Sequence, residues 1–149
     1  MPRYTQEDEK IAHSEFGVVK DEEYLLRIIY APEHIRDDLV IESAIALDDL
    51  STRGFSLDRD AYKNDSAIQQ RISTQSDKQP DQRQTYFIAK FQCISVRDML
   101  DEANKRAFIV IDDVHDDNKA HASLYSAKAN LGKGILRKLR SQLLPLLQK

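Results

Sequence analysis

Residues 108–127, FIVIDDVHDDNKAHASLYSA, contain two apolar runs that flank a polar turn. The first run, residues 108–111, has four bulky apolar residues, which is typical of a buried strand. In the second run, small or apolar residues alternate with His121, Ser123 and Tyr125, as in a strand with two different faces. Because Asp and Asn favour turns, the whole stretch predicts an antiparallel pair of strands.

The segments before and after this pair extend the same pattern. Residues 22–30 and 86–96 are rich in aliphatic and aromatic residues and predict two strands, and residues 55–58 predict a short one. Residues 95–105 predict a short helix, and residues 128–149 predict an amphipathic helix that Pro145 ends or kinks. We therefore expect an α+β fold in which a mainly antiparallel sheet is covered on one face by the C-terminal helix.

The chain has 149 residues, which fits one domain covering residues 1–149. Two polar segments are expected to be less well fixed. The first is a loosely ordered N-terminal arm, residues 1 to about 20. The second spans about residues 63–85, which carry only two large aliphatic residues and predict a helical fragment or a mobile surface loop.

Composition narrows the class of protein. Charged residues make up 32% of the chain and hydrophobic residues 41%, which is typical of a globular protein. The single cysteine, Cys93, excludes an internal disulfide and any zinc site built from several cysteines. The N-terminus has no apolar leader, and no run approaches the roughly 18 apolar residues that span a bilayer. We therefore expect a soluble cytoplasmic protein without a membrane span.

Charge is distributed unevenly along the chain. All 25 acidic residues lie at or before Asp117, whereas the segment after it carries seven basic residues and no acidic one. The basic face of the C-terminal helix is a candidate partner-binding surface for a protein or a nucleic acid. Alternatively, its positive charge balances the acidic remainder of the same chain or of a second copy. Its residues are Lys133, Arg137, Lys138 and Arg140.

The Asp and His residues after the first apolar run are candidates for metal binding or catalysis. Four acids and histidines are candidate metal ligands: Asp112, Asp113, His115 and Asp117. Three residues are catalytic candidates: His121, Ser123 and Asp112. Carboxylate and imidazole groups together suit divalent metals, but the spacing matches neither HExxH nor an EF-hand, and no GxxxxGK[ST] cradle accompanies the FIVIDD strand. A solvated turn explains the same residues.

A third group in the first half of the chain combines cationic and polar side chains that suit a nucleotide or another anion. Its members are Arg27, His34, Glu42, Ser43 and Arg53. Nothing in their spacing brings them together by itself, and each arginine has acids nearby in the sequence with which it can pair.

These observations support three hypotheses for function. The first is a small binding or regulatory module that acts on a protein partner or on a second copy, with no cofactor. The second is a small hydrolase that depends on a divalent metal or on phosphate and uses the cluster at residues 112–121. The third is nucleic-acid binding through the C-terminal helix.

Overall fold

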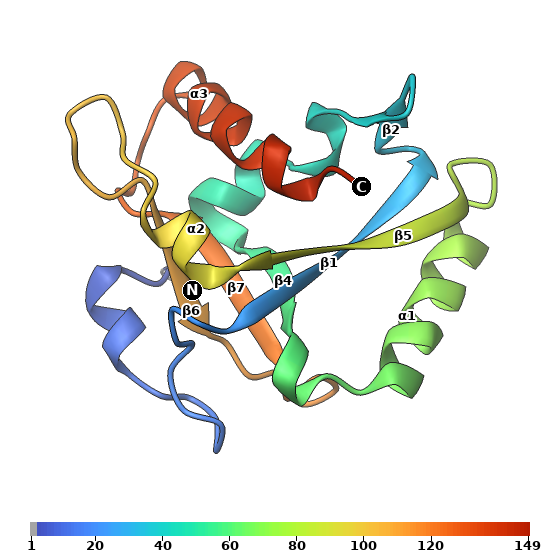
Figure 1. Cartoon of the computed structure of the whole chain (residues 1–149), viewed down its shortest axis with the longest axis horizontal. Helices are drawn as coiled ribbons and strands as arrows, with labels where there is room; N and C mark the ends of the chain where they lie inside the picture. Colours follow the sequence, from blue (N-terminus) through green and yellow to red (C-terminus); the bar gives the residue numbers. More distant parts are fainter. Residues whose placement is uncertain (1–2) are drawn as a thin grey trace.

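The computed structural model describes residues 3–149 and contains one five-stranded antiparallel sheet with helices on both of its faces (Figure 1). Every neighbouring pair of strands in it is antiparallel. In spatial order the strands are β5 (Arg83–Gln92), β1 (Tyr24–Pro32), β4 (Phe55–Arg59), β7 (His121–Ser126) and β6 (Phe108–Asp112). The α+β fold with a mainly antiparallel sheet is confirmed.

Residues 3–149 further contain three α-helices, a small hairpin and several single helical turns. The helices are α1 (Asp65–Lys78), α2 (Cys93–Arg97) and α3 (Lys133–Leu143), and the hairpin consists of β2 (Ile35–Arg36) and β3 (Leu39–Val40). The helical turns are Gln6–Lys10, Glu42–Ala44, Asp49–Arg53, Asp60–Tyr62 and Leu144–Leu147. None of the helices in residues 3–149 is both long and apolar enough to cross a bilayer.

The pairing of β6 with β7 is the hairpin that the sequence predicts. Its register places Ile111 opposite Ser123 and Asp112 opposite Ala122. Paired residues share a face, so Asp112 lies on the same face as Ala122, whereas His121 and Ser123 lie on the other. The turn between the strands is closed by two backbone hydrogen bonds of 3.1 Å between His115 and Asn118.

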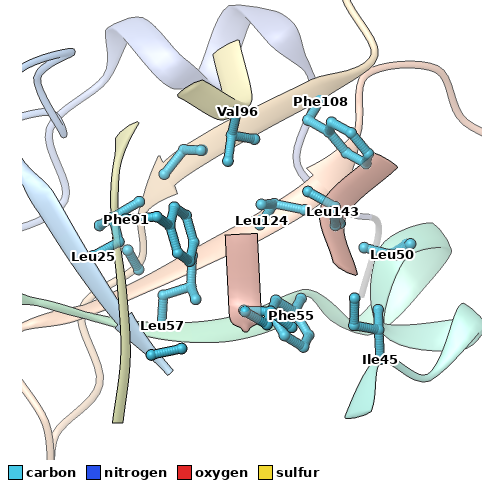
Figure 2. Close-up of a cluster of buried hydrophobic side chains, with 14 of the residues drawn as sticks. Leu25, Ile45, Leu50, Phe55, Leu57, Phe91, Val96, Phe108, Leu124 and Leu143 are labelled. Atoms are coloured by element: carbon cyan, nitrogen blue, oxygen red, sulfur yellow. The ribbon is translucent and has the colours of Figure 1, made fainter. Parts of the chain in front are cut away.

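The main core lies between one face of the sheet and α3 (Figure 2). Three leucines of α3 are buried in it, Leu136, Leu139 and Leu143, and each stabilises the fold by about 1.5–3 kcal/mol through burial. The expectation that α3 covers one face is therefore confirmed. Ile135, which precedes Leu136 in α3, is 47% exposed although it is apolar. Pro145 lies in the helical turn that follows α3.

The strand predicted for residues 86–96 ends earlier, at Gln92, where α2 begins. The backbone N–H of Cys93 donates to Glu23 O (2.8 Å), next to the last pair of the β1–β5 ladder, Tyr24 with Gln92. In α2 the buried residues Cys93 and Val96 are three apart, which is a helical spacing. Burial raises the pKa of the Cys93 thiol to about 12, so it stays a packed, protonated side chain.

The polar segment at about residues 63–85 contains α1, which is the helical alternative predicted for it. Asn64 caps this helix by accepting a hydrogen bond from the N–H of Ala67 (3.0 Å). Ile68 and Ile72 pack on Tyr30 and form a small second core. The residues of β1 in this second core are Ile28 and Tyr30, whereas Leu25 and Ile29 of β1 belong to the main core. Because side chains alternate between the two faces of a strand, α1 and α3 lie on opposite faces of β1.

The N-terminal segment, predicted as an arm, lies against the sheet from residue 3 onward. The Glu9 carboxylate accepts hydrogen bonds from Arg106 (2.6 Å), Arg97 (3.1 Å) and the N–H of Val110 (2.9 Å). Ser14 donates its N–H to the buried Asp112 carboxylate (2.8 Å). These contacts place the segment against β6, the edge strand of the sheet, while its mobility in solution stays a prediction.

The sheet opens between β1 and β4. These strands pair at only two positions, Leu25 with Arg59 and Leu26 with Asp58, whereas β1 pairs with β5 from Tyr24 to Pro32. Beyond Leu26 the β1–β5 ribbon therefore diverges from the other three strands, as Figure 1 shows. The divergence positions the candidate functional site described next.

Candidate functional site

A cavity of about 380 Å³ lies where β1 separates from β4. Its walls come from β1, the turn after β1, the segment at residues 43–49, β4, α1 and β5. Seven polar or charged side chains around it matter for its chemistry: Arg27, Glu33, His34, Asp49, Asp58, Arg71 and Arg83. Side chains with full charges thus outnumber the neutral polar ones in this part of the lining.

Arg27 has few partners in this cavity. Its guanidinium lies over the ring of Phe55, 4.1 Å from the ring centroid, and Nη1 donates to Ser56 O (2.8 Å). Its Nε atom is buried and has no acceptor, which is true of no other buried side-chain nitrogen or oxygen in residues 3–149. Burial lowers the pKa of Arg27, although an arginine stays protonated at neutral pH. Arg27 therefore carries a partly desolvated charge with unused hydrogen-bond donors.

The acids around the cavity are bound to other arginines. Three ion pairs engage them: Glu33 with Arg83 (2.6 Å), Asp58 with Arg71 (2.8 Å) and Asp49 with Arg53 (3.2 Å). The hydrogen bond from Arg83 lowers the pKa of Glu33, whereas burial raises the pKa of Asp49. Arg27 makes no ion pair with any of the described residues, so its charge is left without a direct counterion.

His34 adds a second donor to the cavity wall. The backbone N–H of Tyr30 donates to His34 Nδ1 (3.0 Å), so the proton of the neutral imidazole is on Nε2. Burial is the main reason that the pKa of His34 is lowered, and the charges of Arg27 and Arg83 lower it further. A neutral His34 therefore faces the cavity at pH 7, and an anion placed beside it would favour its protonation.

Together these groups suit a small anion. Its oxygens would accept from the free N–H groups of Arg27, and a carboxylate or phosphate would supply the counterion that Arg27 lacks. The walls also offer apolar surface from Leu26, Ile28 and Tyr30, which suits the carbon skeleton of a small organic ligand.

The sequence grouped some of these residues and missed others. Arg27, His34 and Ser43 line the cavity as a group, but Glu42 and Arg53 are outside its lining. Arg71 and Arg83 come from the polar segment whose sequence predicts only a helix or a loop. Ile68, Arg71, Ile72 and Gln75 follow the helical i, i+3, i+4, i+7 spacing, and this spacing is the signal that Arg71 and Gln75 face inward.

The predicted Asp and His cluster divides between the two faces of the hairpin. Asp113, His115 and His121 come together, each with an atom able to bind a metal, and these atoms lie within 4.8 Å of one another. Asp112 lies on the opposite face, where it accepts from Arg59 (3.1 Å) and Ser14. Asp117 is exposed and outside the group.

The three catalytic candidates do not come together, because Asp112 lies on the opposite face of the hairpin from His121 and Ser123. The Ser123 hydroxyl donates to Asp113 Oδ2 (2.6 Å) instead of to an imidazole. A serine nucleophile needs a base to take its proton, and a histidine is the usual one. Burial is the main cause of the lowered pKa of His121.

The four basic residues of α3 do not form one free stripe. Lys133 and Arg137 are exposed, but Lys138 pairs with Glu102 (2.7 Å). Arg140 is half-buried and donates to Ile45 O (3.3 Å). Half of the predicted partner-binding set is thus engaged within the chain, and partner binding by the rest stays a prediction.

No protein-family model matches the chain, and no curated protein or solved structure matches it either. The fold and the geometry of the two groups of residues are therefore the grounds for assigning a function.

Proposed function

We propose that this protein is a binding module for a small anionic ligand that carries a carboxylate or phosphate group and occupies the cavity between β1 and β4. The observation that carries the proposal is Arg27, whose charge has no counterion within ion-pair distance among residues 3–149 and whose Nε–H has no acceptor. Buried polar groups without partners are rare in folded proteins, and a site that binds an ion or a ligand is one place where they occur. The proposal keeps the binding module expected from the sequence and replaces its protein partner with a small ligand.

The surrounding ion pairs favour an anion over a cation. Glu33, Asp49 and Asp58 each have an arginine within 3.2 Å, so a cationic ligand would have to displace an existing partner. An anion would meet Arg27 without breaking any of these pairs. The pairs also hold the walls in place, so the site is organised before the ligand arrives.

Sulfate is a suitable probe because its charge stays at −2 across neutral pH. The melting temperature of the wild-type protein should rise in a saturable way with sulfate, since a ligand that binds only the native state stabilises it by mass action. At a concentration of about 100 Kd the gain is about 2.7 kcal/mol. Arg27→Met should lose this saturable response, because it removes the guanidinium and keeps an apolar stem.

Arg36→Gln is the matched control, because Arg36 is an exposed arginine in the β2–β3 hairpin and outside the cavity. Sulfate also stabilises proteins generally by exclusion from their surface, so the diagnostic quantity is the difference between variants. Equal responses in the wild type, Arg27→Met and Arg36→Gln would contradict the proposal. Acetate and inorganic phosphate, tested in the same way, separate a carboxylate site from a phosphate site.

A further inference from the structure

We propose that Asp113, His115 and His121 form a binding site for a divalent transition-metal ion of the zinc class. The three side chains come from β7 and from the turn that joins β6 to β7, and their ligand atoms lie within 4.8 Å of one another. This site is separate from the anion cavity, whose lining contains none of the three residues.

The Asp113 carboxylate is oriented but not neutralised. Ser123 donates to its Oδ2 (2.6 Å) and Tyr4 to its Oδ1 (3.3 Å), so both oxygens are held by hydroxyl groups. Within the described part of the chain no lysine or arginine forms an ion pair with it; the nearest ionisable nitrogens are His115 Nε2 (3.6 Å) and His121 Nδ1 (3.7 Å). A bound cation would supply the missing charge.

His121 has the hydrogen bond that a metal-ligating histidine usually has. Its Nδ1 lies 2.8 Å from the backbone carbonyl of Asp113 and 3.7 Å from the Asp113 carboxylate. Because the carbonyl can only accept, Nδ1–H donates to it, and the ring nitrogen that keeps a lone pair for a metal is Nε2. The imidazole is almost fully buried, so its position is fixed by packing. This bond to a carbonyl therefore sets both the tautomer and the direction of the ligand nitrogen.

His115 completes the set from the exposed side. Its ring stacks on His121 with 3.7 Å between ring centroids and an angle of 21° between planes. Lone pairs lie in the ring plane, so two stacked rings must tilt apart to share one ion. The side chain of His115 is 47% exposed and has the space to make this rotation.

The donor set determines the class of ion. Two imidazole nitrogens and one carboxylate suit zinc and the neighbouring transition metals, whereas calcium and magnesium prefer oxygen ligands alone. Three protein ligands leave a tetrahedral ion one position for water. Asp112 cannot take the place of Asp113 in this set, because it faces the other side of the hairpin.

The chain has four histidines, so the ring signals in an NMR titration with zinc chloride test the site directly. We expect the ring signals of His115 and His121 to change and saturate, while those of His13 and His34 stay where they are. If none of the four changes up to millimolar zinc, or if all four change in parallel, the proposal is wrong.

His115→Gln should weaken zinc binding at least tenfold and, because this side chain is exposed, should leave the fold intact. His13→Gln is the control, since His13 is an exposed histidine outside the cluster. Ser123→Ala should weaken binding about 10-fold or more through loss of the bond that orients Asp113. Zinc binding by His115→Gln with wild-type affinity would overturn the assignment. Arg27→Met should bind zinc normally, so failure of the anion proposal is distinguishable from failure of this one.

Discussion

Arg27 and Arg59 lie on adjacent strands of the same sheet, but their surroundings are opposite in kind. Arg59 is fully buried, and all its N–H groups have acceptors: the Glu23 and Asp112 carboxylates and two backbone carbonyls. Arg27 donates to one carbonyl, Ser56 O. The charge of Arg59 is fully withdrawn from water and that of Arg27 only partly, yet only Arg59 has counterions within the described residues.

This difference is the one that we expect between a structural arginine and an arginine that binds a ligand. A guanidinium whose donors are all used has none left for a ligand, and its loss strands the charges around it. A guanidinium with unused donors beside a cavity is able to bind a ligand, and its loss leaves no charged group without a partner, only the carbonyl of Ser56 without this donor. The two residues should therefore respond to the same substitution with opposite signs.

Arg59→Met should have the largest effect. It leaves Glu23 and Asp112 buried without their cation, and breaking a buried pair in this way lowers the free energy of unfolding by about 3–5 kcal/mol. Chemical denaturation measures the change, with Arg36→Gln expected within about 0.5 kcal/mol of the wild type. A loss below about 1 kcal/mol for Arg59→Met would remove the distinction between the two arginines.

Arg27→Met should have a smaller effect in the opposite direction. The Nε–H without an acceptor destabilises the wild-type protein by about 1–3 kcal/mol. The substitution removes this cost, but the loss of the contact with Phe55 offsets part of the gain in stability. We expect the free energy of unfolding in sulfate-free buffer to rise by about 1 kcal/mol. If the variant is instead as unstable as Arg59→Met, Arg27 is a structural residue and the anion proposal fails.

The smallest effect concerns the pH dependence of stability through His34. Its pKa in the folded protein is below the ordinary 6.5, so the unfolded chain binds this proton more readily. His34 therefore makes the free energy of unfolding fall as the pH drops through 6.5 toward the folded pKa. Arg27→Met removes one of the charges that lower the pKa of His34. The substitution should therefore raise the pKa of His34 and reduce the loss of stability at low pH.

An NMR titration of the His34 ring in the wild type and in Arg27→Met checks this prediction. Glu33 and Arg83 remain beside the imidazole in both proteins, so the comparison isolates the charge at residue 27. An unchanged His34 pKa would mean that Arg27 and His34 do not act on the same cavity.

The sequence predicted the parts of this molecule that depend on local pattern. The β6–β7 hairpin and the amphipathic α3 follow from short-range periodicity and turn chemistry. The cavity between β1 and β4 does not, because it exists only where β1 leaves β4, and the length of a strand pairing is a tertiary property. Arg27, His34 and Ser43 could be grouped by chemistry, but no local rule places Arg71 and Arg83 opposite them.

The Asp and His cluster shows the same limit at the level of one residue. Asp112 and Asp113 must point to opposite faces, but which of them faces His121 depends on the register of the hairpin. A shift of one residue would exchange their environments. The sequence grouped Asp and His side chains, of which the structure brings Asp113, His115 and His121 together, while the choice between the two acids required the structure.

The contacts of Glu9 have a consequence for the order of folding. Its partners Arg97, Arg106 and Val110 lie 88, 97 and 101 residues further along the chain. Contacts of such long sequence separation form only after the intervening chain is ordered. During synthesis Glu9 therefore leaves the ribosome 101 residues before Val110, and its contacts with β6 cannot form until that later segment has been made.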